Sequence, residues 1–335
     1  MTLTRSVTLA AALMLSLAAC SSGSGTDSAG ESDTRPLIAT TVSPITSIAA
    51  SIAGDCARIE GIVPEGTQSH SFEPSPAVAA LLSNADLILV NGLKLEDPTI
   101  DMAQTNKKDS TQIVEIGTLV LPEADYIYDF SFPKEEGKPN PHLWTDPSYA
   151  IKYAGVIRDQ LSELDPDCAS DYAANFATFE QQATELGEAV AADQQSVPAG
   201  NLKLLTYHDG YAYFARDYSW QVVGAIQASD FEDPTPREVT RLIDQIRSEK
   251  VPAIFGSEVF PSPVLAQISR ETGVRYVDQL RDDDLPGAPG EPQHSWIGLM
   301  RFDYQVMTEA LGGNAKALRD LRLQATPSDT ADYPQ

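Results

Sequence analysis

The sequence has little positive charge and lacks any long apolar run beyond its N-terminus. Its 335 residues contain 23 Lys and Arg against 48 Asp and Glu, a formal net charge of -25. A surface of that sign repels phosphate backbones, so the composition argues against nucleic-acid binding. Past the first 20 residues, no stretch is apolar enough over a sufficient length to span a bilayer.

Histidine is scarce, and the familiar hydrolase motifs are missing. The chain has four histidines, with neither a His-Glu-x-x-His nor a Gly-x-Ser-x-Gly pattern. Those patterns supply the zinc ligands and general base of metalloproteases and the nucleophile of serine hydrolases. Their absence argues against an extracytoplasmic zinc hydrolase, which is one alternative function for this chain. No internal sequence repeat is visible either.

The first 19 residues are typical of a signal peptide. Arg5 supplies the positive charge, residues 7–17 form a short apolar segment, and Leu-Ala-Ala-Cys closes it at Cys20. This ending is a bacterial lipobox, which predicts acylation of Cys20 and anchoring at the outer face of the cytoplasmic membrane. An ordinary signal peptide with a chance cysteine is the alternative. Residues 20–35, rich in Ser, Gly and Asp, then form a flexible tether.

Two cysteines remain after Cys20. Cys56 and Cys168 lie in a chain that the signal peptide sends to an oxidising compartment, which favours a disulfide between them. Two buried free cysteines acting as small apolar residues would give the same sequence.

Short apolar runs alternate with helical patterns from residue 36 onward. Most predicted strands precede a small polar residue and a proline, which together mark a helix start. This alternation predicts an α/β fold with mostly parallel sheets. The helix-start pairs are Ser43-Pro44, Ser75-Pro76, Asp146-Pro147, Thr235-Pro236 and Ser262-Pro263.

One long amphipathic segment divides this pattern. Apolar residues recur at steps of three and four over residues 170–196, which predicts a single rigid backbone helix. We therefore expect an N-terminal lobe at 36–169 and a C-terminal lobe at 197–325. Residues 326–335 are expected to form a frayed polar tail.

Three histidines and one aspartate lie at informative places. His70, His208 and Asp278 follow predicted strands, and His142 precedes a predicted helix. Ligands of α/β sheets bind beyond the carboxyl ends of strands, and imidazole with carboxylate suits Zn²⁺ or Mn²⁺. On chemistry alone, each histidine is more often an ordinary surface or hydrogen-bonded residue.

Other polar residues have plainer interpretations. Glu258 follows a predicted strand and is a candidate for orienting a ligand histidine, with capping or ion pairing equally plausible. His294 is interpreted as a non-ligand, and the run Asp282 to Asp284 as a solvated loop.

Five segments, taken in order, resemble the metal-binding lipoproteins of zinc and manganese ABC importers. The resemblance extends from Pro36 to about Gly313. The segments are Gln-Ser-His-Ser-Phe-Glu-Pro (68–74), Ala-Asp-Leu-Ile-Leu-Val-Asn-Gly (85–92), Asn-Pro-His-Leu-Trp-Thr-Asp-Pro (140–147), Tyr-His-Asp-Gly-Tyr (207–211) and Arg-Tyr-Val-Asp-Gln-Leu (275–280).

The resemblance implies two lobes joined by a backbone helix, with one metal buried between them and an ABC permease as partner. The family's ligand positions fall on His70, His142, His208 and Asp278. A histidine at the third position favours Zn²⁺, whereas the lack of a histidine-rich stretch in residues 122–140 leaves Mn²⁺ open. Four protein ligands close the metal shell, so we expect a monomeric transport component and no enzyme. An additional role as a surface adhesin stays open for an exposed lipoprotein.

Overall fold

The computed structural model describes residues 33–129, 131–227, 234–322 and 329–335. The expected signal peptide, Cys20 and all but the end of the tether lie outside the described residues. Residues Arg35–Gln335 form one unit, and the description below concerns that unit.

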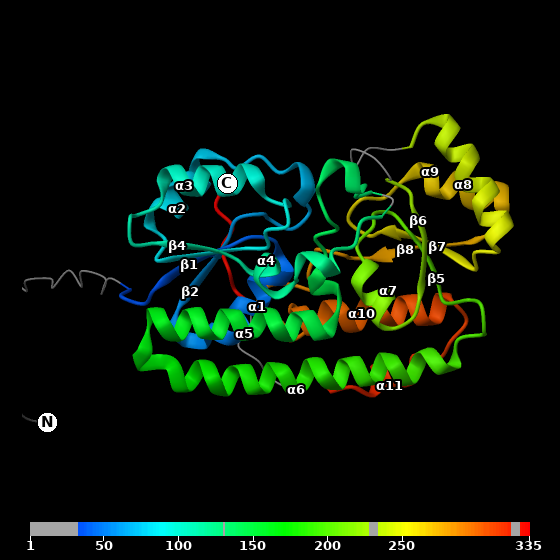
Figure 1. Cartoon of the computed structure of the whole chain (residues 1–335). Coiled ribbons are helices and arrows are strands. Elements are labelled where there is room, and N and C mark those ends of the chain that lie inside the picture. Colours follow the sequence, from blue (N-terminus) through cyan, green and yellow to red (C-terminus); the bar gives the residue numbers. More distant parts are fainter. Residues whose placement is uncertain (1–32, 130, 228–233, 323–328) are drawn as a thin grey trace, which may run out of the picture. The chain divides into compact units, whose positions relative to one another are not determined.

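The first half of this unit is built on a four-stranded parallel sheet. Its strand order is β2-β1-β3-β4, so β2 lies at one edge. The strands β1 and β3 are buried along their whole length, as expected for a sheet covered by helices on both faces. The elements are β1 (Leu37–Thr40), α1 (Ser43–Ala53), β2 (Arg58–Gly61), α2 (Pro76–Asn84), β3 (Leu87–Val90), α3 (Asp97–Asn106), β4 (Gln112–Glu115), α4 (Ile116–Val120) and α5 (Pro147–Leu164) (Figure 1).

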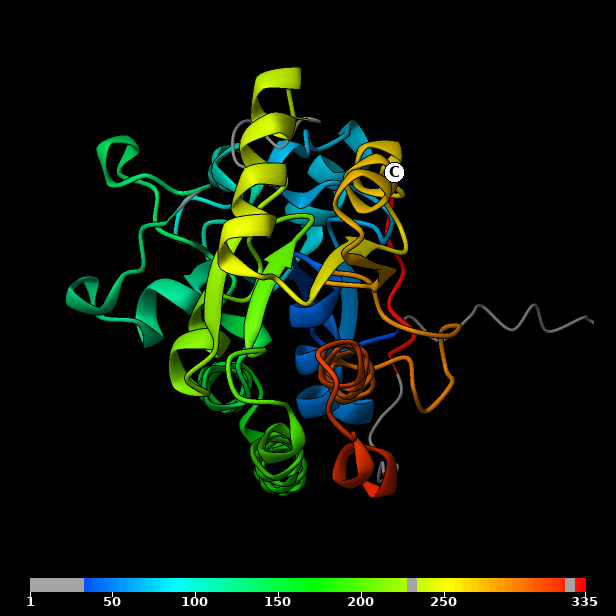
Figure 2. The same cartoon turned by 90° about the vertical axis from the view of Figure 1, so that its right-hand side faces the viewer.

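The second half repeats this plan with a second parallel sheet. Its strand order is β6-β5-β7-β8, and its helices cover the two faces as seen in Figure 2. The elements are β5 (Lys203–Thr206), α7 (Ala212–Asp217), β6 (Gln221–Ala225), α8 (Pro236–Glu249), β7 (Ala253–Ser257), α9 (Pro263–Thr272), β8 (Arg275–Leu280), α10 (Trp296–Ala310) and α11 (Lys316–Asp320). The prediction of an α/β fold with two mostly parallel sheets is confirmed.

The helix-start pairs place the helices correctly, although not all of them cap. The side chains of Ser75, Asp146 and Thr235 accept hydrogen bonds from the first backbone amides of α2, α5 and α8, and Thr235 with Glu238 forms a capping box. Ser43 already lies inside α1, and its hydroxyl donates instead to the carbonyl oxygen of Asp283 at 2.7 Å. The predicted cap is therefore wrong at Ser43, whose hydroxyl joins the two halves of the chain, and also at Ser262, whose side chain makes no capping hydrogen bond to α9.

The long helix α6 (Ala169–Asp193) connects the two halves. It packs against α1 and α5 from the first half and α10 and α11 from the second, and runs beneath both in Figure 1. Phe179 of α6 is buried with its ring centroid 5.4 Å from that of Trp296. Gly187 admits the Tyr218 hydroxyl, which would lie 2.7 Å from a β-carbon there. No helix among the described residues is both long and apolar enough to cross a membrane.

The end of the chain differs from the frayed tail expected from its polarity. The backbone amide of Gly61 donates to the carbonyl oxygen of Asp332 at 2.8 Å, and Glu60 and Asp332 form a parallel bridge. Residues 329–335 therefore lie along the outer edge of β2. Backbone pairing with an exposed sheet edge needs no apolar side chains, which is why composition did not reveal it.

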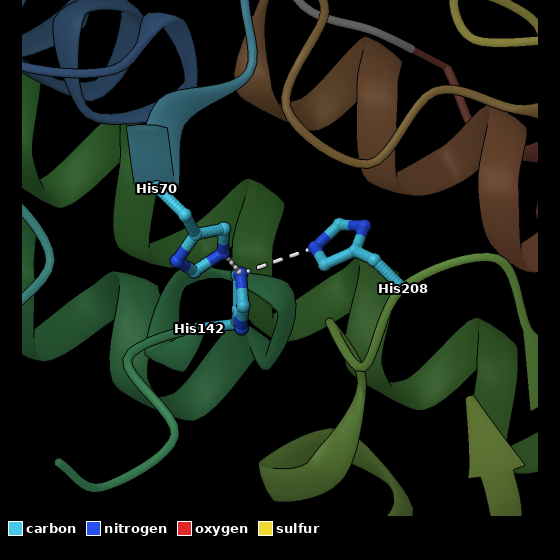
Figure 3. Close-up of side chains that lie close together, drawn as sticks. All are labelled: His70, His142 and His208. Carbon is cyan, nitrogen blue, oxygen red and sulfur yellow. Dashed lines mark hydrogen bonds between the residues drawn. The ribbon is translucent and has the colours of Figure 1, made fainter. Parts of the chain in front are cut away.

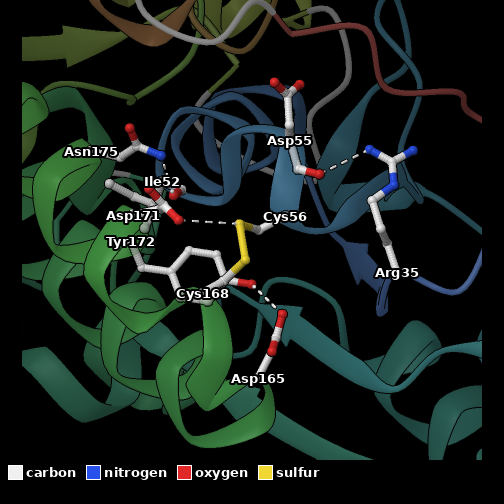
Figure 4. The surroundings of a disulfide bond; sticks show 9 residues. All are labelled: Arg35, Ile52, Asp55, Cys56, Asp165, Cys168, Asp171, Tyr172 and Asn175. Carbon is white, nitrogen blue, oxygen red and sulfur yellow. Dashed lines mark hydrogen bonds between the residues drawn. A yellow bond between two sulfur atoms is a disulfide. The ribbon is translucent and has the colours of Figure 1, made fainter.

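A disulfide ties α1 to the helical pair α5 and α6. The sulfur atoms of Cys56 and Cys168 lie 2.11 Å apart, each at the end of a short 3-10 turn (Figure 4). Beside it, the Asn175 amide of α6 donates to the Ile52 carbonyl of α1 at 3.0 Å. Both contacts join the end of α1 to the first turns of α6, far apart in sequence.

Removing the disulfide should destabilise the fold without altering its architecture. The bond closes a sequence separation of 112 residues, and in the chain-entropy model a loop of that size contributes about 4–5 kcal/mol to the free energy of unfolding. We expect the double variant Cys56→Ser/Cys168→Ser to unfold at lower denaturant concentration by about that difference. Dithiothreitol should destabilise the wild type and leave the double variant unchanged. Equal midpoints for oxidised and reduced wild type would contradict this account.

Candidate metal centre

Three histidines from distant parts of the chain meet at one point. His70 lies in a 3-10 turn (Ser69–Ser71) after β2, His142 directly precedes the turn Leu143–Thr145, and His208 follows β5. The Nε2 atom of His142 lies 3.0 Å from Nε2 of His70 and 3.1 Å from Nε2 of His208 (Figure 3). One ligand nitrogen from each residue lies within 4.8 Å of the others. Three imidazoles arranged this way can hold a divalent transition metal.

Hydrogen bonds fix the tautomer of His142. The Oδ1 atom of Asn140 accepts from the His142 backbone amide at 3.1 Å and lies 2.9 Å from His142 Nδ1. The Nδ2 group of Asn140 donates to Asp129 Oδ2 and to the Asp209 carbonyl, which fixes the orientation of the amide. His142 Nδ1 must therefore carry the proton, leaving the Nε2 lone pair free for a metal.

The segments carrying His142 and His208 are bound to each other. The Thr145 hydroxyl lies 2.9 Å from the His142 carbonyl oxygen and 2.8 Å from that of Gly210. Together with the bond from Asn140 to Asp209, this joins a segment before α5 to one after β5. Gly210 also lies close to the site, because a β-carbon there would lie 3.1 Å from His208 Nε2 and would push the imidazole by a few tenths of an ångström.

Aromatic rings shield the centre from water. The Phe132 ring lies 5.6 Å from the His70 ring and 5.7 Å from the His142 ring, and the Trp144 ring lies 5.1 Å from His142. His142 and Trp144 are fully buried. A low local dielectric strengthens electrostatic interactions with an ion and disfavours positive charge on an unliganded imidazole.

The three imidazoles differ in their affinity for protons. Burial lowers the pKa of His70 and of His142 well below the usual value, and the nearby positive charge of His208 lowers both further. Burial acts in the same direction on His208, but the Asp282 carboxylate, 3.5 Å from Nδ1, outweighs it and raises the pKa of His208 to about 9. At neutral pH, two imidazoles are ready for a metal and the third carries a proton.

The acidic residues are arranged differently from the expectation. Asp278 lies within β8 with its side chain exposed, and in the described part of the chain it is not among the ligand atoms grouped with the histidines. Glu258 is exposed and pairs with Arg281 at 2.8 Å, so its observed partner is an arginine and not a histidine. His294 is buried, 3.9 Å from Glu65, and lies outside the histidine group.

The interpretation of residues 282–284 as a solvated loop is wrong. Asp282 and Asp284 are 7% and 6% exposed, and together with Asp283 they line a small cavity beside His208. Burial raises the pKa of Asp283, whose Oδ2 accepts from the Ser69 hydroxyl at 2.9 Å. Among the described residues its buried Oδ1 has no hydrogen-bond partner. Residues 282–284 follow the end of β8 at Leu280, so the strand-end criterion that pointed to Asp278 could also have pointed to them.

Known proteins similar in sequence to this chain are named as metal-binding proteins or belong to a metal-uptake family. The chain matches the family described as ZnuA, zinc-uptake complex component A periplasmic, over residues 38–310. The iron-binding protein YfeA of Yersinia pestis is 30% identical over 275 residues, 82% of this chain and 86% of its own. The manganese-binding lipoprotein MntA of Halalkalibacterium halodurans is 28% identical over 305 residues, 89% and 97% of the two chains.

Solved structures share the fold. A periplasmic metal binding protein from Candidatus Liberibacter asiaticus has a TM-score of 0.72 at 26% identity, covering 83% of this chain and all of its own. The periplasmic zinc binding protein TroA from Treponema pallidum has a TM-score of 0.74 at 24% identity, with 83% and 99% covered. The two-sheet architecture is therefore shared with known periplasmic binding proteins.

Metal binding at pH 7 should release about one proton, chiefly from His208. The pKa of His208 is about 9, so affinity should rise with pH toward that value, by up to about tenfold per pH unit. In the metal-free protein, the same raised pKa adds stability that is complete below about pH 6.5 and is lost as the pH rises through about 9.

Calorimetry in two buffers of different ionisation enthalpy would count the released protons. The variant Asp282→Asn is the control, because it removes the largest influence that raises the pKa of His208 and should reduce the release. Zinc binding without proton release by the wild type at pH 7 would refute this assignment.

Proposed function

The chain belongs to the ZnuA family, and from that membership we propose that it captures one Zn²⁺ ion with His70, His142 and His208 and passes the ion to an ABC permease. As a member of this family it is an extracytoplasmic metal-binding protein of an ABC importer. The identity of the ion, its ligands and the permease partner are the proposed parts.

The convergence of the three Nε2 atoms carries this proposal. His70 belongs to the first half of the unit and His208 to the second, so an ion held by both would join them. Because ligand nitrogens bind zinc at about 2.0–2.1 Å, Nε2 separations near 3 Å suit a tetrahedral ion with little rearrangement. His142 and His208 lie buried and His70 is half-buried, whereas a surface histidine would be solvated.

Nitrogen ligands favour zinc over manganese at this centre. Imidazole suits Zn²⁺, whereas Mn²⁺ is served better by carboxylate and carbonyl oxygens, and affinity in most sites is weaker for Mn²⁺. Mn²⁺ is the alternative, since MntA is named as a manganese-binding relative. The buried carboxylates beside His208 are the structural feature that favours Mn²⁺.

We propose Asp283 as the fourth ligand, in place of Asp278. The Asp283 carboxylate is held by Ser69, the residue before His70, and its free Oδ1 is buried near His208. Asp283 also lies outside the group of ligand atoms within 4.8 Å of one another, so its carboxylate would move toward the histidines to complete a tetrahedral shell. Asp278 is exposed on β8 and would need the strand end to rearrange.

A closed shell of this kind favours transport over hydrolysis. Catalytic zinc keeps a position open for water beside a general base, whereas four protein ligands leave none. No described feature favours a zinc hydrolase or an adhesin as a separate function.

Acylation of Cys20 would hold the protein beside its permease. The lipobox supports this assignment, and MntA is named as a lipoprotein. Because α6 packs against both halves, we propose that release separates the ligand loops and leaves the two sheets in place. A monomer is sufficient for this cycle.

Single substitutions should distinguish the proposed zinc ligands from nearby residues by their effect on zinc affinity. Outer-sphere changes typically lower metal affinity by about 10–100-fold, so His142→Ala, which removes an inner ligand, should lower zinc affinity by more than about 100-fold. Asp283→Asn should lower it strongly, whereas the matched variant Asp278→Asn should leave it near the wild-type value. Titration against a zinc chelator of known affinity measures all three. A large loss in Asp278→Asn with none in Asp283→Asn would return the fourth ligand to Asp278.

Direct competition should identify the ion. Protein purified without added metal should contain zinc by elemental analysis, and an excess of Mn²⁺ should not displace it, because three imidazoles favour zinc. The variant His208→Glu is the control, since a carboxylate at the third position should shift the preference toward Mn²⁺. Manganese retained by the wild type in the presence of equal zinc would overturn the zinc assignment.

A further inference from the structure

We infer that the C-terminal tail, residues 329–335, fixes the loop that carries His70 and slows the loss of bound metal. Tyr333 is its positioning residue. This inference rests on the proposed function, because it takes His70 to be a metal ligand. The tail lies beyond residues 38–310, so the family match does not include it.

The tail forms one β-bridge to an open sheet edge. β2 is the edge strand of its sheet, and Asp332 pairs with Glu60 in parallel. The Gly61 amide donates to the Asp332 carbonyl at 2.8 Å, and the Gln335 side chain donates to the Ile62 carbonyl at 3.4 Å. These bonds engage the residues at which β2 ends and the segment leading to His70 begins.

Tyr333 and Gly61 are fitted to each other. A β-carbon at residue 61 would overlap Cε1 of the Tyr333 ring, so glycine leaves room for this ring. Burial raises the pKa of the Tyr333 hydroxyl, which lies close to Ser43 and Thr46 at the start of α1. Ser43 in turn donates to the Asp283 carbonyl. The ring thus occupies the space between the end of β2, the start of α1 and the acidic loop of the metal centre.

The loop from Pro64 to Ser71 is itself held by the segment 281–295. The Glu65 carboxylate accepts from the Leu285 amide at 3.0 Å, and the Gly66 amide donates to Asp284 Oδ1 at 2.6 Å. The tail also meets this segment, because the Gly290 amide donates to the Asp329 carbonyl at 3.1 Å. The His70 loop is therefore held directly by the segment 281–295, and the residues just before it, Gly61 and Ile62, are held by the tail. Loss of the tail would release the start of the loop.

Two substitutions remove the ring contact without shortening the chain. Tyr333→Ala deletes the ring, and Gly61→Ala displaces it. The matched controls are Asp332→Ala, which keeps the backbone carbonyl that pairs with Gly61, and Tyr333→Phe, which keeps the ring. Zinc-loaded protein would be mixed with excess chelator and the dissociation rate followed. We expect about 3- to 10-fold faster loss in the two ring variants and rates near wild type in the controls.

Hydrogen exchange on the metal-free protein gives a second readout, which does not depend on zinc. In Tyr333→Ala the amide of Gly61 and those of residues 64–71 should exchange faster, while those of β3 stay protected. Faster exchange together with faster zinc loss supports the inference. Unchanged exchange overturns it, and so does faster exchange with an unchanged rate of zinc loss. If the wild type bound no metal, the proposed function would fail, whereas the exchange comparison would still show whether the tail fixes the loop.

Discussion

The metal centre depends on the hydrogen bonds that join the segment before α5 to the segment after β5. Asn140 and Thr145 bind carbonyl groups at residues 209 and 210 and so bring His142 against His208. Each segment alone is a short irregular connection. Because the two segments are bonded to each other, the positions of His142 and His208 are fixed within the fold. His70 lies on a separate loop, which other segments hold in place.

Electrostatics around these imidazoles follows from where each is placed. His142 is oriented by a neutral amide and lies against Trp144, so burial dominates and the ring stays uncharged. His208 faces the buried carboxylate of Asp282, which retains a positive charge on it. The metal-free centre therefore holds one protonated imidazole paired with one buried carboxylate. An incoming Zn²⁺ replaces a proton, which limits the rise in buried charge.

The sequence sufficed for the fold class, the parallel sheets, the linking helix and the placement of three histidines. The fold class, the sheets and the linking helix depend on local patterns, namely apolar alternation and helix-start pairs. The histidines were selected by their position and, decisively, by the resemblance to known metal-binding lipoproteins. Asp278 was chosen on the same grounds, but β8 continues to Leu280, and the chain turns toward His208 only at Asp282, which has a positive φ of 55°. Neither the length of a strand nor an unusual backbone angle at a non-glycine residue is readable from composition. Asn140, two residues before His142, was missed because its role requires the fold to bring residues 209 and 210 beside it.

The docked C-terminus bears on how this protein can be handled. Gln335 already binds the Ile62 carbonyl, so any appended sequence would begin beside the segment that leads to His70. A polyhistidine tag fused there would bring a row of competing imidazoles to the same side of the sheet and strain the pairing along β2. Purification of an untagged chain, or of one with a tag placed in the tether after Cys20, would keep that edge as it is.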